Sequence, residues 1–196
     1  MANALIDTGI IILAAGESRR LGPPKQLLVI EGETLIRRIA RRAAASTAAE
    51  VLVVLGHGAD AIEPELAGLD KVGTLRNPDW HCGIGSSIRR AVEALARREA
   101  VLISVCDQPH LTTEIFDRLI ARLRHSTTGI VASSYSNILG VPAIFARKHF
   151  AALMELSDAA GAKSLLRAND IDRIHFPDGA VDIDTVEDLV YLEQDL

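Results

Sequence analysis

IIILAAGESRRLGPPKQLL, residues 10–28, is the stretch that decides the fold of this chain. Its first four residues are all large and apolar, which predicts a short strand buried on both faces. The small residues that follow, ending at Gly16, predict a turn whose backbone N–H groups can surround a phosphate. Two arginines and Lys25 add positive charge to the same loop. The stretch therefore predicts a polyphosphate site beyond the carboxyl end of a buried strand.

The spacing in this loop excludes two common phosphate-binding motifs. A Walker A loop has lysine directly after its second glycine, whereas here two prolines separate Gly22 from Lys25. A dinucleotide fingerprint needs a second glycine two residues after the first, and Gly16 is followed by Glu17 and a serine. An ordinary surface loop with solvated charges is the alternative. We favour the phosphate site because glycines and cations gather at one strand end, including Arg20.

Composition fits one globular domain that spans residues 1–196. The chain is 48% apolar and 24% charged, and this length buries roughly 70% of the unfolded surface. Its net charge of −5 disfavours non-specific binding to nucleic acid. The sequence has no apolar run of the ~18 residues that span a membrane and no signal-peptide pattern. Two cysteines, Cys82 and Cys106, form neither a disulfide framework nor a zinc motif. We therefore expect a cytoplasmic protein without membrane association.

Strand and helix patterns alternate along the chain. Apolar runs predict strands over residues 9–13, 51–55, 101–105 and 130–132, and helical periodicity predicts helices over residues 34–45, 84–95 and 112–123. This alternation predicts a single-domain, Rossmann-like α/β fold with a mainly parallel, twisted sheet and helices on both faces. In the first helix, the arginine run is expected to form a solvated face, comprising Arg37, Arg38, Arg41 and Arg42.

Five segments together resemble a known family. LAAGESRRLGPPKQLL (13–28) resembles the signature of the nucleotidyltransferases in the glycosyltransferase-A-like superfamily. The later segments resemble its molybdenum-cofactor cytidylyltransferase and guanylyltransferase branch, and they are RNPDWHCGIGSSI (76–88), VLISVCDQPHL (101–111), ILGVPAIFARKHF (138–150) and VDIDTVEDL (181–189). The likeness runs from about residue 8 to residue 192. It implies the fold of the nucleotide-diphospho-sugar transferases.

Carboxylates at two places are candidate metal ligands. Asp107 follows a buried strand, where it could cap the loop or bind Mg²⁺ together with substrate phosphates. The resemblance implies the metal role for Asp107. Near the C-terminus, Asp184 can begin a helix as part of a capping box. The resemblance implies instead that Asp184 is a second metal-facing carboxylate, with Asp182 as the alternative. Mg²⁺ is the expected ion, and Mn²⁺ is possible.

The segment before the helix at 84–95 is the candidate base and ribose site. Ser86 or Ser87 would make a good N-cap, and this role alone could explain them. The resemblance places Gly83 and both serines beside the nucleotide. His81 and Cys82 depart from the family pattern and are expected to be incidental, and His57 is expected to be a turn residue.

Two segments bear on the acceptor. The family commonly has Gly-His-Pro where this chain has Val141 between Gly140 and Pro142, which leaves the acceptor open. Residues 157–163 are similar to a family turn with one residue inserted, and make Asp158 and Lys163 weak site candidates.

The resemblance implies transfer of a nucleoside monophosphate from an NTP to a phosphorylated acceptor, with release of pyrophosphate. Arg20 and Lys25 would neutralise phosphate charge, and backbone groups would hold the nucleotide at Leu13, Ala14, Ala15, Gly16 and Gly22. Alanine at position 15, where guanylyltransferases tend to carry a second glycine, favours CTP as the nucleotide. The expected acceptor is molybdopterin, and the expected recipient of the product is a molybdoenzyme or its chaperone. The alternatives are GTP, a sugar or polyol phosphate acceptor, and a non-catalytic nucleotide-sensing protein.

Overall fold

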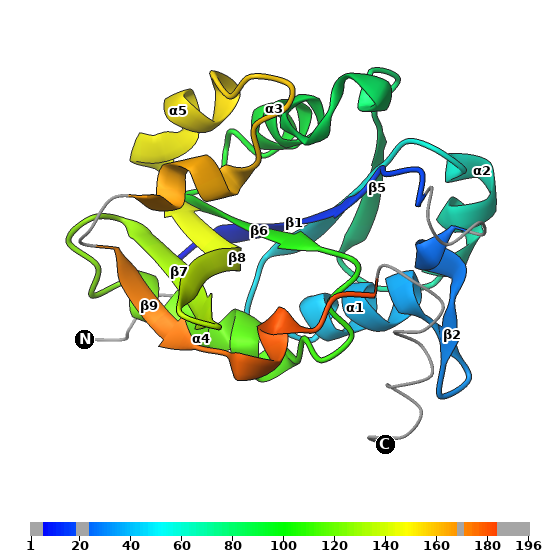
Figure 1. The fold of residues 1–196 in the computed structure, drawn as a ribbon, viewed down its shortest axis with the longest axis horizontal. Coiled ribbons are helices and arrows are strands. Elements are labelled where there is room, and N and C mark those ends of the chain that lie inside the picture. Colours follow the sequence, from blue (N-terminus) through cyan, green and yellow to red (C-terminus); the bar gives the residue numbers. More distant parts are fainter. Residues whose placement is uncertain (1–5, 19–23, 168–170, 184–196) are drawn as a thin grey trace.

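The computed structural model of this protein describes residues 6–18, 24–167 and 171–183. Its centre is a seven-stranded sheet with the strand order β5-β4-β1-β6-β8-β7-β9 (Figure 1). The strands are β1 (Thr8–Ala14), β4 (Glu50–Leu55), β5 (Val72–Arg76), β6 (Ala100–Val105), β7 (Ile130–Tyr135), β8 (Ile138–Ala146) and β9 (Asp172–His175). All four strands predicted from apolar runs are present at the expected positions, because each run is buried in the sheet.

The sheet is mainly parallel, as the alternation of strands and helices predicts. Four of its six strand pairings are parallel, and β8 is the strand that runs antiparallel to both of its neighbours. Strand β1 pairs with β4 on one side and with β6 on the other, so that Leu13 lies opposite Val54 and Val105. The carboxyl ends of these three strands therefore share one edge of the sheet.

Helices cover both faces of the sheet (Figure 1). Helices α1 (Leu35–Ala44) and α4 (Thr113–Leu123) lie on one face, α3 (Ile84–Ala94) and α5 (Phe150–Met154) lie on the other, and α2 (Ala59–Ile62) is a short turn after β4. A small hairpin, β2 (Val29–Ile30) and β3 (Glu33–Thr34), precedes α1. The three predicted helices agree with α1, α3 and α4 to within one residue at each end. None of the helices in the described ranges is long and apolar enough to cross a membrane.

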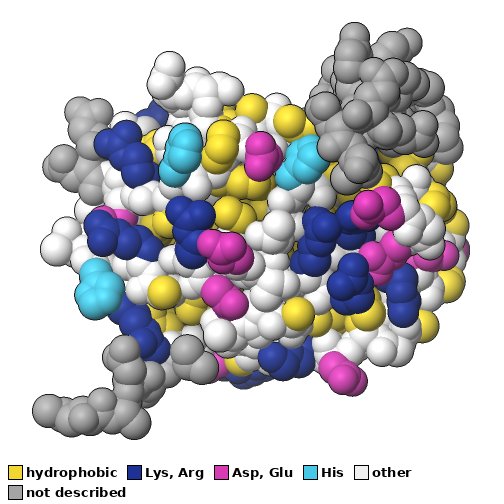
Figure 2. Space-filling view, turned by 90° about the horizontal axis from the view of Figure 1, so that it is seen from below, with side chains coloured by type: hydrophobic (Ala, Val, Ile, Leu, Met, Phe, Trp, Pro, Cys, Tyr) yellow, Lys and Arg dark blue, Asp and Glu magenta, His cyan; other side chains and the backbone are white. Residues whose placement is uncertain are grey.

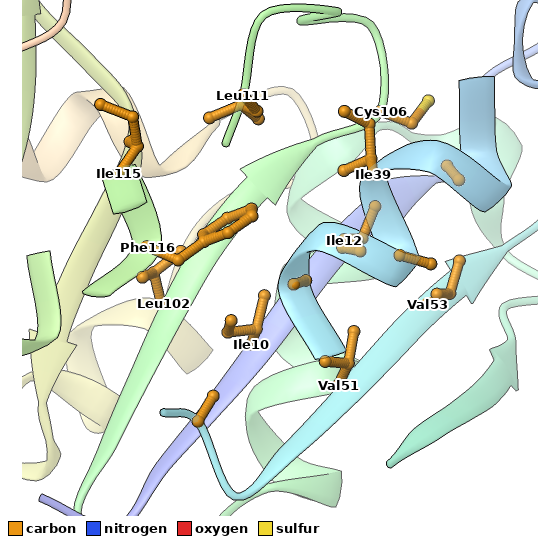
Figure 3. Packing of buried hydrophobic residues seen from close by; sticks show 14 of the residues in the cluster. Ile10, Ile12, Ile39, Val51, Val53, Leu102, Cys106, Leu111, Ile115 and Phe116 are labelled. Atoms are coloured by element: carbon orange, nitrogen blue, oxygen red, sulfur yellow. The ribbon is translucent and has the colours of Figure 1, made fainter. Parts of the chain in front are cut away.

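The core has two halves, one on each side of the sheet. Side chains alternate along β1, so that Ile10 and Ile12 pack with Ile39 and Phe116 beneath α1 and α4 (Figure 3). Residues Ile11 and Leu13 belong to the second half, under α3 and α5. Every residue of β1 is buried. This strand therefore anchors both layers and fixes the position of the loop that follows it.

The arginine face of α1 differs from the prediction. The surface formed by α1 and α4 carries basic and acidic side chains next to each other (Figure 2), but three of the arginines are anchored in the protein. Arg38 is only 8% exposed and donates to the carbonyl of Ile30 at 3.1 Å. Arg42 donates to the carbonyls of Pro109 and Leu111 at 2.8 and 2.6 Å. Arg37 donates to the carbonyls of Glu65 and Ala67 at 2.6 and 3.1 Å. For these three residues the prediction of a solvated face is wrong, because neighbouring segments present carbonyl oxygens to the helix.

Candidate active site

A cleft of about 390 Å³ opens at the carboxyl ends of β1 and β6. Three segments form most of its lining: the loop after β1, the residues after β6, and the start of α3. The lining residues are Leu13, Ala14, Ala15, Gly16, Glu17, Ser18, Lys25, Gln26, Trp80, His81, Gly83, Ile84, Ser87, Val105, Cys106 and Asp107. The fold thus brings three predicted site segments to one cavity, where ligands of open α/β sheets usually bind.

The loop after β1 is held in shape by its own side chains. Gln26 is 1% exposed, and its amide nitrogen donates to the carbonyls of Ala14 and Gly16 at 2.9 and 3.1 Å. The hydroxyl of Ser18 accepts a hydrogen bond from the Lys25 backbone N–H at 3.1 Å. Lys25 itself begins a single 3₁₀ turn, Lys25–Leu27. The described parts of the loop, residues 15–18 and 24–27, are therefore held in place beside the cleft, whereas Arg20 and Gly22 lie outside the described residues.

Gly16 leaves room in the cleft. A Cβ atom built on Gly16 would meet no heavy atom within 4 Å, so packing against the rest of the described protein does not demand a glycine here. The neighbouring Ala15 is 8% exposed, and its carbonyl accepts a hydrogen bond from the His57 backbone N–H at 3.1 Å. Because both residues line the cleft, the missing side chain at Gly16 allows a ligand to approach the backbone closely.

Lys25 and Asp107 form an ion pair in this cleft, although they are 82 residues apart in the sequence. Their side chains are 16% and 19% exposed. Only the Oδ2 atom of Asp107 takes part in this pair, while its Oδ1 atom is buried and has no hydrogen-bond partner among the described residues. An unpartnered buried carboxylate oxygen is costly. Asp107 therefore lines the cleft with one carboxylate oxygen paired to Lys25 and the other buried without a partner among the described residues.

A divalent cation fits this donor set when phosphate is present. Within the described ranges no group of three or more His, Cys, Asp or Glu side chains could hold a metal. Mg²⁺ commonly binds through one or two carboxylates and completes its shell with substrate phosphates and water. Asp107 offers such a carboxylate. The adjacent Cys106 is no competing ligand, because burial raises the pKa of its thiol to about 12.

The Asp-Ile-Asp segment approaches the same place. The backbone N–H of Ile183 donates to the carbonyl of Asp107 at 2.9 Å, which brings Asp182 into the neighbourhood of Asp107. Burial, and next the Asp182 carboxylate, raise the pKa of Tyr135 nearby. Asp184 and the capping box expected to begin there lie outside the described residues, so both roles of Asp184 stay predictions.

The start of α3 differs from the expected N-cap. The helix begins at Ile84 with Gly83 as its N-cap, so Ser86 and Ser87 lie inside the first turn. Both serines are nearly buried, and their hydroxyls accept hydrogen bonds from the Asn77 amide at 2.9 and 3.0 Å. The hydroxyl of Ser86 also donates to backbone carbonyls, which gives this residue a structural task. Gly83 and Ser87 line the cleft, whereas Ser86 is not among its lining residues.

Two aromatic rings at the cleft were missed by the sequence analysis. Trp80 and His81 both line the cavity, and the expectation that His81 is incidental to function stays a prediction. Trp80 makes edge-to-face contacts with His81 and His57, at ring-centroid distances of 6.2 and 5.3 Å. A Cβ on Gly56 would lie 2.5 Å from the Cβ of Trp80. Trp80 is therefore fixed in place. The sequence signal for it was a lone tryptophan shortly before a Gly-Ser turn.

The segments expected to face the acceptor do not line this cleft. Val141 lies in β8, and Asp158 forms an ion pair with Arg89. Gly83 and Gly85 pack so closely against residues 157–160 that a Cβ on either would collide with backbone atoms. Asp158 therefore supports the start of α3, and Lys163 is exposed in a 3₁₀ turn. Neither of these two residues is among those that line the cavity.

The fold and the cleft together define an α/β protein whose ligand-sized cavity, at the carboxyl ends of its strands, is lined by the Lys25–Asp107 ion pair. The sequence matches the family of MobA-like NTP transferase domains over residues 10–174. The chain belongs to this family of nucleotidyltransferases.

Individual proteins extend the comparison. The chain is similar to the nicotine blue oxidoreductase of Paenarthrobacter nicotinovorans, with 32% identity over 93% of this chain and 94% of that protein. It is 29% identical to the bifunctional protein GlmU of Pseudomonas syringae pv. tomato over 80% of this chain, and spans 35% of the length of GlmU. The crystal structure of Rv0371c from Mycobacterium tuberculosis H37Rv is similar with a TM-score of 0.83, at 25% identity over 97% of this chain and all of that one.

Proposed function

We propose that this protein transfers CMP from CTP to a phosphorylated acceptor, molybdopterin, and releases pyrophosphate. The observation that carries the proposal is the Lys25–Asp107 ion pair beside the phosphate loop, in which Asp107 Oδ1 is buried and unpartnered. A cation and an anion held together at a cleft are suited to a ligand that brings both phosphates and a metal ion. The molybdopterin acceptor rests on the MobA-like family match.

Several residues of the loop after β1 have a task in this proposal. Backbone N–H groups of residues 14–16 bind the triphosphate, because a turn after a buried strand presents several of them to an anion. Lys25 neutralises phosphate charge, and its pairing with Asp107 keeps both charges satisfied before the nucleotide arrives. Arg20 and Gly22 complete the loop on the strength of the family resemblance.

Asp107 and Asp184 are the proposed ligands of a divalent cation, Mg²⁺ or Mn²⁺. The unpartnered Oδ1 of Asp107 supports the first assignment, and the hydrogen bond from Ile183 to Asp107 supports the second by bringing that segment near. When bound, such an ion supplies charge neutralisation at the α-phosphate.

The acceptor phosphate serves as the nucleophile. A phosphate monoester is largely ionised near neutral pH, so the enzyme needs no covalent intermediate. The obstacle is to bring two polyanions together in line, and positioning with charge neutralisation therefore dominates the rate enhancement. The fixed loop, the Lys25–Asp107 pair and the first turn of α3 provide these rigid contacts.

Base selection is assigned to Ala15 and the start of α3. The Cβ of Ala15 narrows the cleft compared with a glycine, which favours a pyrimidine over a purine. Gly83 and Ser87 line the same cavity and offer uncharged groups to a base edge. GTP remains the alternative nucleotide.

A pyrophosphate-release assay with each of the four NTPs, Mg²⁺ and molybdopterin tests the proposal. We expect release with CTP and weaker release with GTP. Release that requires a sugar or polyol phosphate instead would move the acceptor to that class. Nucleotide binding without any release would favour a non-catalytic, nucleotide-sensing protein.

The cellular setting belongs to the same proposal. A product that carries the molybdenum cofactor would pass to a molybdoenzyme or its chaperone in the cytoplasm. Co-purification of the tagged protein with such a recipient tests this step, and absence of any molybdoenzyme or chaperone would count against it.

Reduction of a dye is a second candidate function. It is favoured by the 32% identity with nicotine blue oxidoreductase, which extends over 94% of that protein. The discriminating experiment follows the absorbance of nicotine blue with NADH or NADPH as electron donor. Bleaching without pyrophosphate release from any NTP would establish the second candidate, whereas release without bleaching would support nucleotidyl transfer.

A further inference from the structure

Gln108, the residue after Asp107, is a buried amide that the proposed chemistry does not use. It is 1% exposed. Its Nε2 atom donates to the carbonyl of Gly179 at 2.9 Å and to that of Val141 at 3.3 Å, while its Oε1 atom is buried without a hydrogen-bond partner in the part of the chain that the structure describes. An apolar side chain of similar size would avoid this unpaired oxygen. It would also lose the two hydrogen bonds by which the Gln108 amide holds the Gly179 and Val141 carbonyls together.

The two hydrogen bonds of Gln108 connect separate parts of the chain. Gly179 lies in the 3₁₀ turn Pro177–Ala180, just before Asp182. Four residues further on, Ile183 donates to the carbonyl of Asp107 at 2.9 Å. Residues 179–183 are thus tied at both ends to the Asp107-Gln108 pair. The position of Asp182 relative to Asp107 depends on the hydrogen bond from Gln108 to Gly179 and the one from Ile183 to Asp107.

Tyr135 contacts both the Val141 carbonyl and the turn that contains Gly179. Its hydroxyl donates to the carbonyl of Val141 at 3.2 Å, the same oxygen that Gln108 contacts. A Cβ on Gly179 would lie 2.8 Å from the Tyr135 ring and 2.6 Å from the Phe176 ring. The turn therefore packs against Tyr135 without spare room, and a shift of Gln108 would move the turn.

We infer that Gln108 is a positioning residue that holds residues 179–183 against Asp107 and so sets the geometry of the cation site. Gln108 acts through Asp107 and the turn, and itself touches neither substrate nor metal. This inference rests on the proposed function, because it needs a cation at Asp107. Residues that hold metal ligands in place typically change metal affinity or activity 10–100-fold when they are replaced.

The variant Gln108→Met tests this role, because methionine keeps the length of the side chain and removes the amide. Mn²⁺ binding is measured by electron paramagnetic resonance in the presence of a non-hydrolysable CTP analogue. We expect the Mn²⁺ dissociation constant to rise at least about tenfold, with the affinity for the analogue in the absence of metal unchanged within about twofold.

Ser133→Ala is the matched control. Ser133 is also fully buried and donates to the carbonyl of Pro142 at 2.8 Å, a hydrogen bond next to Val141 that does not involve residues 179–183. This variant should lower the melting temperature and leave Mn²⁺ affinity unchanged. An equal loss of Mn²⁺ affinity in Ser133→Ala and Gln108→Met would assign the effect to general loosening and overturn the inference.

The outcomes separate the inference from the proposed function. Wild-type protein that binds no Mn²⁺ with the CTP analogue would overturn the metal assignment of the proposed function. Wild-type binding together with unchanged affinity in folded Gln108→Met would overturn only the role of Gln108. If Gln108→Met does not fold, Tyr135→Phe takes its place, because it removes only the hydroxyl that holds Val141. A smaller loss of Mn²⁺ affinity is then expected, and an unchanged dissociation constant would overturn the inference.

Discussion

Replacing Lys25 by alanine removes the cation that the proposed mechanism uses to neutralise phosphate. In the structure, Lys25 Nζ pairs with Asp107 Oδ2, and both side chains are mostly buried, with 16% and 19% exposed. The substitution therefore has two effects. It removes a charge that faces the phosphates, and it leaves the Asp107 carboxylate without its partner.

The two effects differ in size. Loss of one pre-organised charge-stabilising group usually costs on the order of 10²–10³ in turnover, or about 2.7–4 kcal/mol of transition-state stabilisation. An exposed ion pair contributes at most about 1 kcal/mol to stability, while breaking a fully buried one costs about 3–5 kcal/mol. For this partly exposed pair we expect about 2 kcal/mol. A domain with a typical stability of about 5–15 kcal/mol stays folded after that loss.

The assay is CTP-dependent pyrophosphate release, with stability measured by urea unfolding of the same samples. Lys148→Ala is the control. The Lys148 ammonium donates a hydrogen bond to the carbonyl of Thr127 at 3.2 Å, and Lys148 is not among the residues that line the cleft. The control removes the same charge and should keep full turnover. Near wild-type turnover in folded Lys25→Ala would refute the reasoning.

Three further substitutions probe the cleft. Asp107→Asn keeps the shape of the side chain, so metal-dependent activity should collapse with an unchanged circular dichroism spectrum; unfolding with normal specific activity of the folded fraction would make Asp107 a structural cap. Ala15→Gly should reduce the preference for CTP over GTP by about 1–3 kcal/mol, measured by titration calorimetry, and a wild-type preference for GTP would contradict the assignment of the base. Gly16→Ala should change the free energy of unfolding by no more than about 0.5 kcal/mol, since the new Cβ meets nothing within 4 Å. It should weaken CTP binding about tenfold, because a methyl group in a binding pocket costs about 1–3 kcal/mol. Unchanged CTP binding would place the nucleotide elsewhere.

The fold was predictable where strands are buried on both faces. The runs that became β1, β4 and β6 are nearly continuous apolar stretches, and such stretches indicate central parallel strands. Strands β5 and β9 escaped prediction because they are edge strands with exposed polar residues. Strand β8 escaped because Pro142 argues against an interior strand. The sheet accommodates this proline through an irregular register between β7 and β8, at Ala132 and Ser133.

The site was predictable in its parts and not in its contacts. The rule that ligands bind beyond the carboxyl ends of strands placed Lys25 and Asp107 at the same edge, but the ion pair between them depends on tertiary structure. The partners of Ser86 and Ser87 were hidden for the same reason, because Asn77 reaches them from the end of β5. Gln108 was overlooked because a glutamine after a strand has no distinctive pattern until its burial is known.

The most direct test of nucleotidyl transfer uses CTP labelled either at the α-phosphate or at the γ-phosphate, with molybdopterin and Mg²⁺. The account predicts that the α label appears in the acceptor product and that the γ label appears in pyrophosphate. Lys25→Ala should slow both by the same factor, because one displacement at the α-phosphate produces both products. Transfer of the γ label to the acceptor, or bleaching of nicotine blue with no transfer of either label, would contradict it.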